Sequence, residues 1–539
     1  MRKIVAVIAV ACALGAYAEE RTVSTAQELY EALEALNSKT APAEPNIIYL
    51  RPGSYDVSFY AMKHWSSSGK ASTSAKHIAL AHVTVSGKSD NPRDTVIYGN
   101  GTDGIVHCYV GSLRHLTISN GCETGTETLN RAGGVYNAGA DSIHSNVIVT
   151  CCSSATIGGG ASSGTWYDST IISNRSSSNG GGVIFGTWYN CNIVSNSAST
   201  SKTGGGCYYE TVLHDCRVIG NRAKYGGGLG GGDGKTHYCR VYGGVIADNY
   251  AGTYGGGGYR TEFLGGTVVS NNTAATSGGG VSMEATIVLT NTVICCNTAA
   301  NGGGVSGKGF CSDCEIYGNK ATATGGGFNN GFATNCVIYA NSAKDGGGCG
   351  TGAYVDCVIS NNTASGGGGG ACFGFSTNCL FTGNTAARGG AACSNECVSC
   401  ELVGNRATYG GGCHYGSTTN CTIASNVSTA YGGGAYSGTH ADDVLTNNLA
   451  KSNGGGGYYG TYRDCLIACN MVTSGVDKVY GGGLRSAIAY RCVISNNVIE
   501  ALGTASDGEA LGAGVYGGQI YEVIAKPLFR AIHEPSHMA

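Results

Sequence analysis

Cysteine spacing is the first feature of this sequence that could carry chemistry. Cys393, Cys397 and Cys400 form C-x-x-x-C-x-x-C, a spacing used for radical iron–sulfur clusters, and Cys311 and Cys314 form C-x-x-C. A metal needs ligands that converge on one point. The same cysteines fall on a regular repeat, and that repeat accounts for their spacing. We therefore expect them to fill the protein interior rather than to hold a cluster.

Three acidic residues, Asp442, Asp443 and Asp464, are candidates for calcium ligands. They come from two adjacent repeats, and carboxylate oxygens are ligands that Ca²⁺ prefers. Asp443 takes a slot that holds cysteine in other repeats, where a buried charge would be costly. The alternative is structural. Asn or Asp usually precedes the repeated cysteine, and an Asx turn there would lead the chain into its strand.

Tyrosines recur two residues after the glycine triplets and are candidates for ligand binding. They are Tyr136, Tyr208, Tyr259, Tyr436, Tyr458 and Tyr516. If the residue before each tyrosine faces the interior, the tyrosine faces solvent. An exposed row of aromatic rings would stack on sugar rings or dock a protein surface. The alternative is that tyrosine simply favours strands.

The elements that position these residues follow from a repeat of about 23 residues. Each unit has the pattern Asx-Cys-x-Ile-x-x-Asn, a few small residues, three glycines and a short apolar run. Within residues 191–195, alternate side chains face one way, which is the period of a strand. Each unit therefore predicts one coil of a parallel β-helix with three short strands, each bonded to the same strand one coil on. The anchor asparagines are Asn174, Asn196, Asn221, Asn249, Asn272, Asn297, Asn319, Asn341, Asn362, Asn384, Asn405, Asn426, Asn448, Asn470 and Asn497.

Equivalent residues of successive coils are then expected to stack in columns. One column holds Cys191, Cys216, Cys239, Cys314, Cys336, Cys357, Cys379, Cys400, Cys421, Cys465 and Cys492. Cysteine is a small hydrophobe that suits a narrow interior, and we expect Cys151, Cys296 and Cys469, just before an anchor, to face inward too. Stacked side chains run parallel, so mostly free thiols are expected, although export would favour some disulfides. Asparagine is expected at the corners, because it tolerates left-handed dihedral angles.

The N-terminal residues predict export. Residues 1–18 combine two basic residues, a short apolar run and Ala16-Tyr17-Ala18 before Glu19, as in a secretory signal. A lipoprotein signal at Cys12 is the alternative. Residues 22–37 predict a helix that Ser24 or Thr25 caps. We therefore expect a signal (1–18), a cap helix (19–45), a β-helix (46–520) and a tail (521–539).

The segment after this helix resembles the entry of right-handed parallel β-helix proteins of the pectin-lyase-like class. Residues 50–55, Leu-Arg-Pro-Gly-Ser-Tyr, match the L-x-P-G-x-Y turn of that class, and strands follow at 83–87, 95–99 and 116–120. In those proteins a helix covers the first coil, which protects an open sheet end. The resemblance implies an all-β right-handed parallel β-helix, a solenoid with an N-terminal capping helix.

From about residue 130 to residue 520, the coils resemble the repeats of polymorphic outer membrane proteins, which are autotransporters. Gly389-Gly390-Ala391 and Gly433-Gly434-Ala435 are close to the GGA[ILV] motif of that class, and Ile-x-x-Asn stands in for FxxN. The resemblance implies a secreted or cell-surface protein that is associated with the outer membrane. Only about 20 residues follow Gly518, too few for an eight-stranded membrane barrel, so an intact autotransporter is not expected.

Composition and missing motifs narrow the function. A net charge of −3 without a basic run argues against nucleic acid, and we expect no transmembrane segment in the mature chain. Polygalacturonases of the pectin-lyase-like class carry NTD, DD, GHG and RIK motifs, and only Asp442-Asp443 matches here. We expect a non-enzymatic, adhesin-like protein that contacts a cell-surface glycan or protein, with no cofactor except calcium. The alternatives are a polysaccharide-active lyase or glycoside hydrolase, and a structural surface-layer component.

Overall fold

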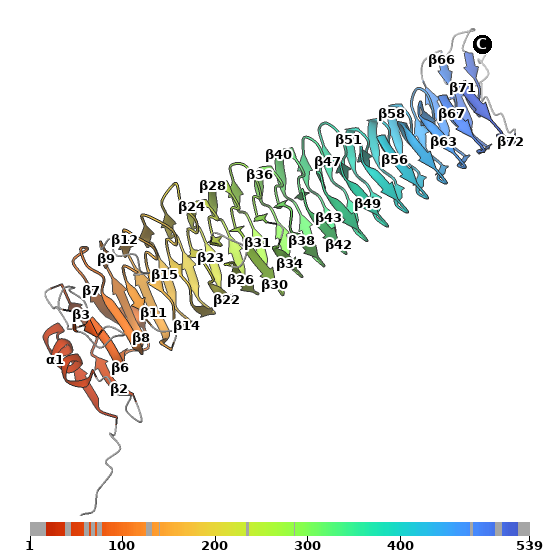
Figure 1. Ribbon diagram of the computed structural model, residues 1–539. Helices are drawn as coiled ribbons and strands as arrows, with labels where there is room; N and C mark the ends of the chain where they lie inside the picture. Colours follow the sequence, from red (N-terminus) through yellow and green to blue (C-terminus); the bar gives the residue numbers. More distant parts are fainter. Residues whose placement is uncertain are drawn as a thin grey trace, which may run out of the picture. The chain divides into compact units, whose positions relative to one another are not determined.

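The chain folds into parallel β coils, as a computed structural model shows (Figure 1). The structure describes residues 18–37, 45–58, 64–65, 71–72, 78–124, 132–138, 141–232, 237–284, 286–474, 478–501 and 509–526. It divides into two compact units, Met1–Ser197 and Ala198–Ala539. Within each unit, strands pair in parallel with the equivalent strands of the next coil, which confirms the right-handed parallel β-helix expected from the sequence.

One coil of the second unit illustrates the repeat. It contains four short strands: β48 (Ala371–Cys372), β49 (Phe375–Thr377), β50 (Leu380–Thr382) and β51 (Thr385–Arg388). This coil has one strand more than the predicted three, whereas the coil of β56 (Cys413–Thr419), β57 (Thr422–Ala424) and β58 (Val427–Tyr431) has three, because its first two strands are continuous. A residue with left-handed dihedral angles follows each strand, and these residues are Phe373, Asn378, Gly383 and Gly389. Because each such residue turns the chain sharply, the strands remain only two to four residues long.

The anchor asparagines do not occupy the corners, contrary to the sequence prediction. The left-handed residue is the one before the anchor, for example Ala340 (φ 53°) and Asn361 (φ 53°). Asn341 and Asn362 themselves point inward and are almost completely buried. The backbone N–H of Asn341 donates to Oδ1 of Asn362 (2.9 Å), and its Nδ2 donates to the same oxygen (3.1 Å) and to Ile316 O (2.9 Å).

This pattern repeats coil after coil. In the second unit, each anchor from Asn221 to Asn470 donates its backbone N–H to the amide oxygen of the next anchor. In the first unit, Asn174 donates in the same way to Asn196. The anchors therefore form an internal asparagine ladder, in which buried amides satisfy one another and the adjacent backbone.

The glycine triplets let neighbouring coils approach closely. Gly346 has φ 62°, so it makes a left-handed turn, whereas Gly347 lies directly against the next coil. A Cβ on Gly347 would lie 2.5 Å from the carbonyl oxygens of Gly369 and Thr363. Only glycine fits this contact without displacing backbone.

The column of cysteines lies inside, as predicted, with thiols directed at backbone carbonyls. Cys336 Sγ lies 3.2 Å from Thr334 O and 3.6 Å from Cys311 O. Burial raises the pKa of Cys239 to about 12, so such a thiol stays protonated. The 25 cysteines in the described part of the chain are free thiols.

Three cysteines depart from the expected inward orientation. Cys151, Cys296 and Cys469 are exposed and have φ between 54° and 58°. They hold the left-handed corner before the anchor, and that corner directs the side chain outward. The prediction that they face the interior was wrong, because a corner residue does not follow the alternation of a strand.

The N-terminal helix covers the start of the first unit (Figure 1). Helix α1 (Ala26–Leu36) begins after Thr25, whose side chain accepts from Glu28 N (3.2 Å), and buries Leu29, Ala32, Leu33 and Leu36. It starts later than predicted, because β1 (Glu20–Val23) pairs with β2 (Asn46–Leu50). After the helix, the Asn37 side chain bonds Ala79 O and Ala81 N of β6 (Ile78–Gly87), which fixes the helix against that strand.

The predicted ends of the chain lie mostly outside the described residues. The predicted signal falls there except for Ala18, and so do residues 527–539 of the predicted tail. The tail does include β72 (Ile524–Lys526), which pairs with β68 (Val493–Ser495) and so extends the coils beyond residue 520. Among the described residues, no helix combines the length and the apolar character that a membrane crossing requires.

Replacing Asn362 by alanine tests the asparagine ladder. The change leaves Asn341 N and Nδ2 without their acceptor and Ile338 O without a donor. Because each buried unsatisfied group costs about 1–3 kcal/mol, we expect a loss of about 4 kcal/mol in the free energy of unfolding, measured by urea denaturation. The matched control is Asn361→Gly, since Gly383 holds that corner one coil on, and it should change stability little. Equal effects of the two changes would contradict a special role for the buried anchor.

Candidate functional site

Three aromatic side chains stand out from one corner of the second unit. Phe373, Tyr415 and Tyr459 are 55%, 58% and 45% exposed. Each holds the same left-handed corner of its coil, with φ of 60°, 52° and 59°. In the coils between and after them the same corner carries serine: Ser394, Ser437 and Ser486. Aromatic side chains therefore occupy every second coil.

A left-handed aromatic residue is locally unfavourable. Bulky residues at positive φ cost of order 1–3 kcal/mol, whereas serine, asparagine or glycine reach this region more easily. Ladder hydrogen bonds impose the conformation, since Phe373 N donates to Cys393 O (3.1 Å) and Tyr459 N donates to Arg485 O (2.8 Å). The corner aromatics lie on the surface and gain no core burial that would offset this cost, which favours a functional role for them.

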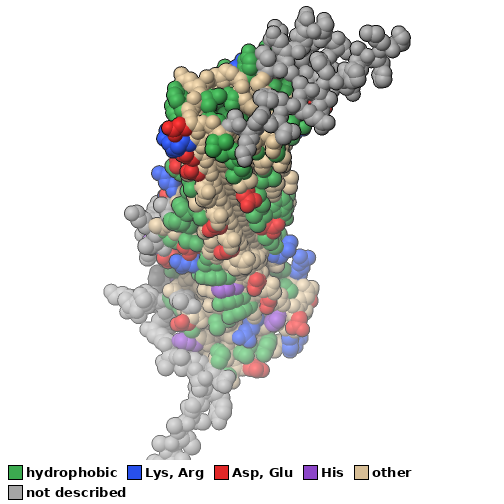
Figure 2. Space-filling view, turned by 90° about the vertical axis from the view of Figure 1, so that its right-hand side faces the viewer, with side chains coloured by type: hydrophobic (Ala, Val, Ile, Leu, Met, Phe, Trp, Pro, Cys, Tyr) green, Lys and Arg blue, Asp and Glu red, His purple; other side chains and the backbone are tan. Residues whose placement is uncertain are grey.

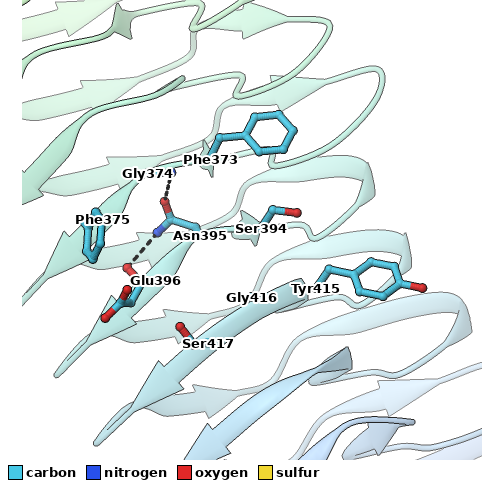
Figure 3. Close-up of a pocket in the computed structure, with 9 residues that line it drawn as sticks. All are labelled: Phe373, Gly374, Phe375, Ser394, Asn395, Glu396, Tyr415, Gly416 and Ser417. Carbon is cyan, nitrogen blue, oxygen red and sulfur yellow. Dashed lines mark hydrogen bonds between the residues drawn. The ribbon is translucent and has the colours of Figure 1, made fainter.

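A hollow of about 380 Å³ lies beside two of these corners (Figure 3). Phe373 and Tyr415 extend to one side of it with Ser394 between them, and Phe375 and Glu396 lie along the other side. The hollow is lined by Phe373, Gly374, Phe375, Ser394, Asn395, Glu396, Tyr415, Gly416 and Ser417. It thus combines exposed apolar rings, hydroxyl groups and one carboxylate.

Asn395 fixes the floor of this hollow. The residue is 2% exposed, and its Oδ1 accepts from Gly374 N (2.9 Å), a contact drawn in Figure 3. Its Nδ2 donates to Ser376 Oγ (3.0 Å) and to Glu396 O (3.2 Å). These bonds link β49 to β53 (Glu396–Val398), so Phe375 and Glu396, which are register partners, keep a fixed spacing.

Two predicted tyrosines support the corner aromatics from behind. Tyr436 and Tyr458 are half-buried and stack on each other with ring centroids 5.4 Å apart. The ring of Tyr436 meets Tyr415 edge-on at 5.9 Å, and that of Tyr458 meets Tyr459 edge-on at 4.4 Å. Tyr431 stacks on Tyr458 at 4.8 Å and extends this layer. We call Phe373, Tyr415 and Tyr459, together with Tyr431, Tyr436 and Tyr458, the aromatic surface. Ring contacts brace Tyr415 and Tyr459 within it.

An arginine extends the same column toward the C-terminus. Tyr458 of β62 (Gly457–Tyr458) pairs in register with Arg485 of β67 (Leu484–Tyr490), which pairs with Tyr516 of β71 (Val515–Tyr521). The Arg485 guanidinium lies over the rings of Tyr480 (5.2 Å) and Tyr516 (4.8 Å), which stack on each other at 4.3 Å. This cation–π group adds one positive charge to the end of the column.

The six predicted tyrosines do not form one continuous row. Tyr208 and Tyr259 share a column but are separated by Gly230, and Ser282 and Ser306 follow them. Tyr136 belongs to the first unit, where its ring meets His107 edge-on at 4.7 Å. Of the six, Tyr436 and Tyr458 contact the corner aromatics, and Tyr516 lies two coils beyond Tyr458.

Sequence reasoning missed the exposed residues Phe373, Tyr415 and Tyr459. It assumed strict alternation and assigned the outward position to the tyrosine, whereas the residue after it holds the left-handed corner. The signal that could have found them is the aromatic–serine alternation at this corner.

The three predicted calcium ligands, Asp442, Asp443 and Asp464, do not lie together in the structure. Asp443 is buried, and its carboxylate accepts from Cys421 N (2.7 Å) and from the Thr418 hydroxyl. Asp442 and Asp464 are exposed at the outer corner, and Asp464 is paired with Arg491 (2.7 and 2.6 Å). Asp443 therefore cannot share one ion with the outer pair without leaving its partners. Calcium binding stays a prediction for Asp442 and Asp464 alone.

Cys393, Cys397 and Cys400 were expected to fill the interior, and all three are buried. Cys393 Sγ lies 3.8 Å from His414 Nδ1, whereas Cys397 Sγ lies 3.3 Å from Asn395 Nδ2. In the part of the chain that the structure describes, the one group of three such ligand atoms within 4.8 Å of one another is Cys311, Cys314 and Cys336. The C-x-x-C pair is thus joined by a third thiol from the next coil, contrary to the expectation of a straight column.

Charge is mixed on the face shown in Figure 2, where acidic and basic side chains lie among apolar and uncharged ones. Nucleic acid would require clustered lysine and arginine to neutralise phosphates. The formal net charge of the whole chain is −3.

No family description and no curated protein matches the chain. Among solved structures it is similar to sacteLam55A from Streptomyces sp. SirexAA-E, at 10% identity over 95% of each chain with a TM-score of 0.21. It is also similar to the catalytic unit of a GH87 α-1,3-glucanase from Streptomyces thermodiastaticus (9% identity, 93% and 66% covered, TM-score 0.19). A third is PfbA, a surface adhesin of Streptococcus pneumoniae (9% identity, 93% and 89% covered, TM-score 0.14). Similarities this weak carry no argument about activity.

Two buried ionisable residues, Asp443 and His440, predict that the free energy of unfolding depends on pH. Burial raises the pKa of Asp443 to about 6 and lowers the pKa of His440, which lies 3.8 Å from it, to about 4. The raised pKa of Asp443 means that its contribution is favourable at low pH and is lost as pH rises through about 6. The lowered pKa of His440 acts oppositely, costing stability as pH falls from about 6.5 to about 4.

Asp443→Cys isolates the aspartate, because it restores the residue of the column and leaves His440 in place. Relative to the parent protein, we expect the variant to be more stable at pH 8 than at pH 4 by about 3 kcal/mol, from about two pKa units. Urea denaturation at both pH values measures this difference. If the difference in the free energy of unfolding between the variant and the parent protein were the same at both pH values, the pKa of Asp443 would not be raised by burial.

Proposed function

We propose that this protein is a non-enzymatic, secreted or surface-held protein that binds an extended glycan along the aromatic surface. The observation that carries the proposal is the alternation of exposed aromatic and serine residues at one corner, Phe373, Tyr415 and Tyr459 against Ser394 and Ser437. Large exposed aromatic side chains that gather on one face of a protein mark sites of interaction.

The spacing suits a linear chain of sugar rings. Successive coils are about 4.8 Å apart, so rings on alternate coils are about 10 Å apart. That distance is comparable to two pyranose units of an extended polysaccharide. The apolar face of every second sugar would then meet an aromatic ring, while the intervening serine offers a hydroxyl group to the sugar between them.

The rigidity of the surface supports binding without large entropic loss. Tyr415 and Tyr459 are braced edge-on by Tyr436 and Tyr458, so few rotamers remain to be lost when a ligand arrives. Aromatic side chains with two torsion angles supply large contact areas at low conformational cost.

The hollow favours binding over cleavage. Among the nine residues that line it, Glu396 is the only carboxylate. Glycosidases use a pair of carboxyl groups on either side of the scissile bond. A polysaccharide-active enzyme remains the alternative function, and the experiment below distinguishes it by its products.

Export is part of the proposal and rests on the sequence. The signal-like residues 1–18 and the resemblance of the coils to polymorphic outer membrane protein repeats both support a secreted or cell-surface location. A cell-surface glycan is a ligand that such a protein would meet, and a protein partner is the alternative.

Replacing the corner aromatics by serine tests the proposal. Because serine already holds this corner at Ser394 and Ser437, Tyr415→Ser and Tyr459→Ser should leave the fold intact. On a glycan array, we expect the double variant to lose at least about tenfold in affinity, the equivalent of about 1.4 kcal/mol. The matched control is Tyr339→Ser, which removes a stacked tyrosine (4.9 Å from Tyr317) on another strand of its coil, β43 (Val337–Tyr339).

Unchanged glycan binding by the double variant would contradict the proposed surface. Shortened or unsaturated products from a glycan that binds would instead favour the enzymatic alternative.

Ligand length provides an independent test. Phe373 and Tyr459 are four coils apart, a distance of about 19 Å. We expect affinity to rise with oligosaccharide length until the chain spans all three aromatic residues and then to level off, as measured by calorimetry with a series of defined oligomers. In the Tyr459→Ser variant the plateau should come at a shorter length. Equal affinity for a disaccharide and a long oligomer would be inconsistent with a site that runs along the coils.

A further inference from the structure

Three thiols meet inside the second unit. Cys311 lies in β38 (Phe310–Ser312), Cys314 follows the corner residue Asp313 (φ 54°), and Cys336 occupies the slot of Cys314 one coil on. All three are at most 2% exposed. Their Sγ atoms lie within 4.8 Å of one another.

The third member arises from a local sequence difference. The interior slot of Cys311 is held by Leu289 one coil earlier and by Ala333 one coil later. Of the three, Cys314 and Cys336 belong to the cysteine column and stack on successive coils. Cysteine at residue 311 places a sulfur beside both of them, across the corner.

We propose that Cys311, Cys314 and Cys336 form a binding site for a soft, thiophilic monovalent metal ion, of which Cu(I) is the biological example. The group consists of three sulfur atoms without imidazole or carboxylate. Thiolates select soft ions such as Cu(I), whereas structural Zn²⁺ requires a fourth ligand to complete a tetrahedron. Three sulfurs suit a trigonal ion, and burial protects Cu(I) from water and oxidants.

The protein supplies the proton chemistry of binding. The Cys314 thiol donates to Ser312 O (3.2 Å) and the Cys336 thiol donates to Thr334 O (3.2 Å), so metal binding replaces these hydrogen bonds with bonds to the ion. Each sulfur that binds as thiolate releases its proton to solvent, and the charge of the ion offsets one thiolate. No electron is transferred, since copper enters and remains as Cu(I).

The test compares two cysteine-to-alanine variants at equivalent positions. Cys311→Ala copies Ala333 of the next coil and should fold normally. Cys397→Ala is the matched control, because Cys397 holds the same interior slot next to Cys400 of the column but belongs to no converging trio among the described residues. Thermal melting confirms that both variants fold.

The full-length protein is loaded anaerobically with Cu(I) by two routes, incubation of the folded protein and refolding from denaturant. In both routes a Cu(I) chelator of known affinity is present and competes for the ion. We expect the parent protein and Cys397→Ala to retain one copper that Cys311→Ala lacks. This copper should show thiolate-to-copper absorption in the ultraviolet and three sulfur neighbours by X-ray absorption. Equal copper content in Cys311→Ala and Cys397→Ala, or no retained copper in the parent protein by either route, would overturn the proposal. A Zn²⁺ titration completes the test, and tighter retention of Zn²⁺ than of Cu(I) would also overturn it.

Discussion

The asparagine ladder is the interaction on which the structure depends. At each anchor from Asn249 to Asn497, the buried amide oxygen accepts two hydrogen bonds from the anchor one coil before, and the amide nitrogen donates to a strand carbonyl. A buried amide is costly unless all its groups are satisfied, and here each coil satisfies its neighbour. The ladder therefore fixes the register and the spacing of the coils, and the glycine triplets allow the close approach that it requires.

Because the interior fixes the register, the corners are free to vary in chemistry. The left-handed positions accept Ser394, Tyr415 and Cys469 alike, since the backbone there is held by ladder bonds rather than by the side chain. Regular spacing along the coils then converts a choice of residue at one corner into a periodic surface. The aromatic surface is such a case, and its period of two coils is a property that no isolated loop would provide.

The regular stacking of coils also brings ionisable side chains together in the interior. Successive slots of the column place thiol above thiol, and a single cysteine in a neighbouring slot, Cys311, turns a pair into a group of three. Where an acid replaces the thiol, as at Asp443, the slot holds it away from water and pairs it with Thr418 and Cys421 N. Each interior position thus has a fixed degree of burial and fixed backbone partners, and the residue type at that position determines its chemistry.

The sequence by itself determined the parallel β coils and the buried cysteine column, because a repeat of about 23 residues with alternating apolar positions is compatible with few other folds. It also determined the capping helix, through the helical spacing of its leucines and its N-terminal capping residue. It did not determine what happens at the corners. Strand alternation predicts where Cys296 and Tyr436 should point, but a left-handed residue interrupts that alternation, so Cys296 turns out to solvent and Tyr436 is half-buried behind Tyr415. Only the tertiary structure showed that the anchor asparagines bond across coils, that Asp443 is separated from Asp442 and Asp464, and that Cys336 joins Cys311 and Cys314. These contacts join residues 21 to 25 positions apart, and their geometry depends on how one coil settles on the next.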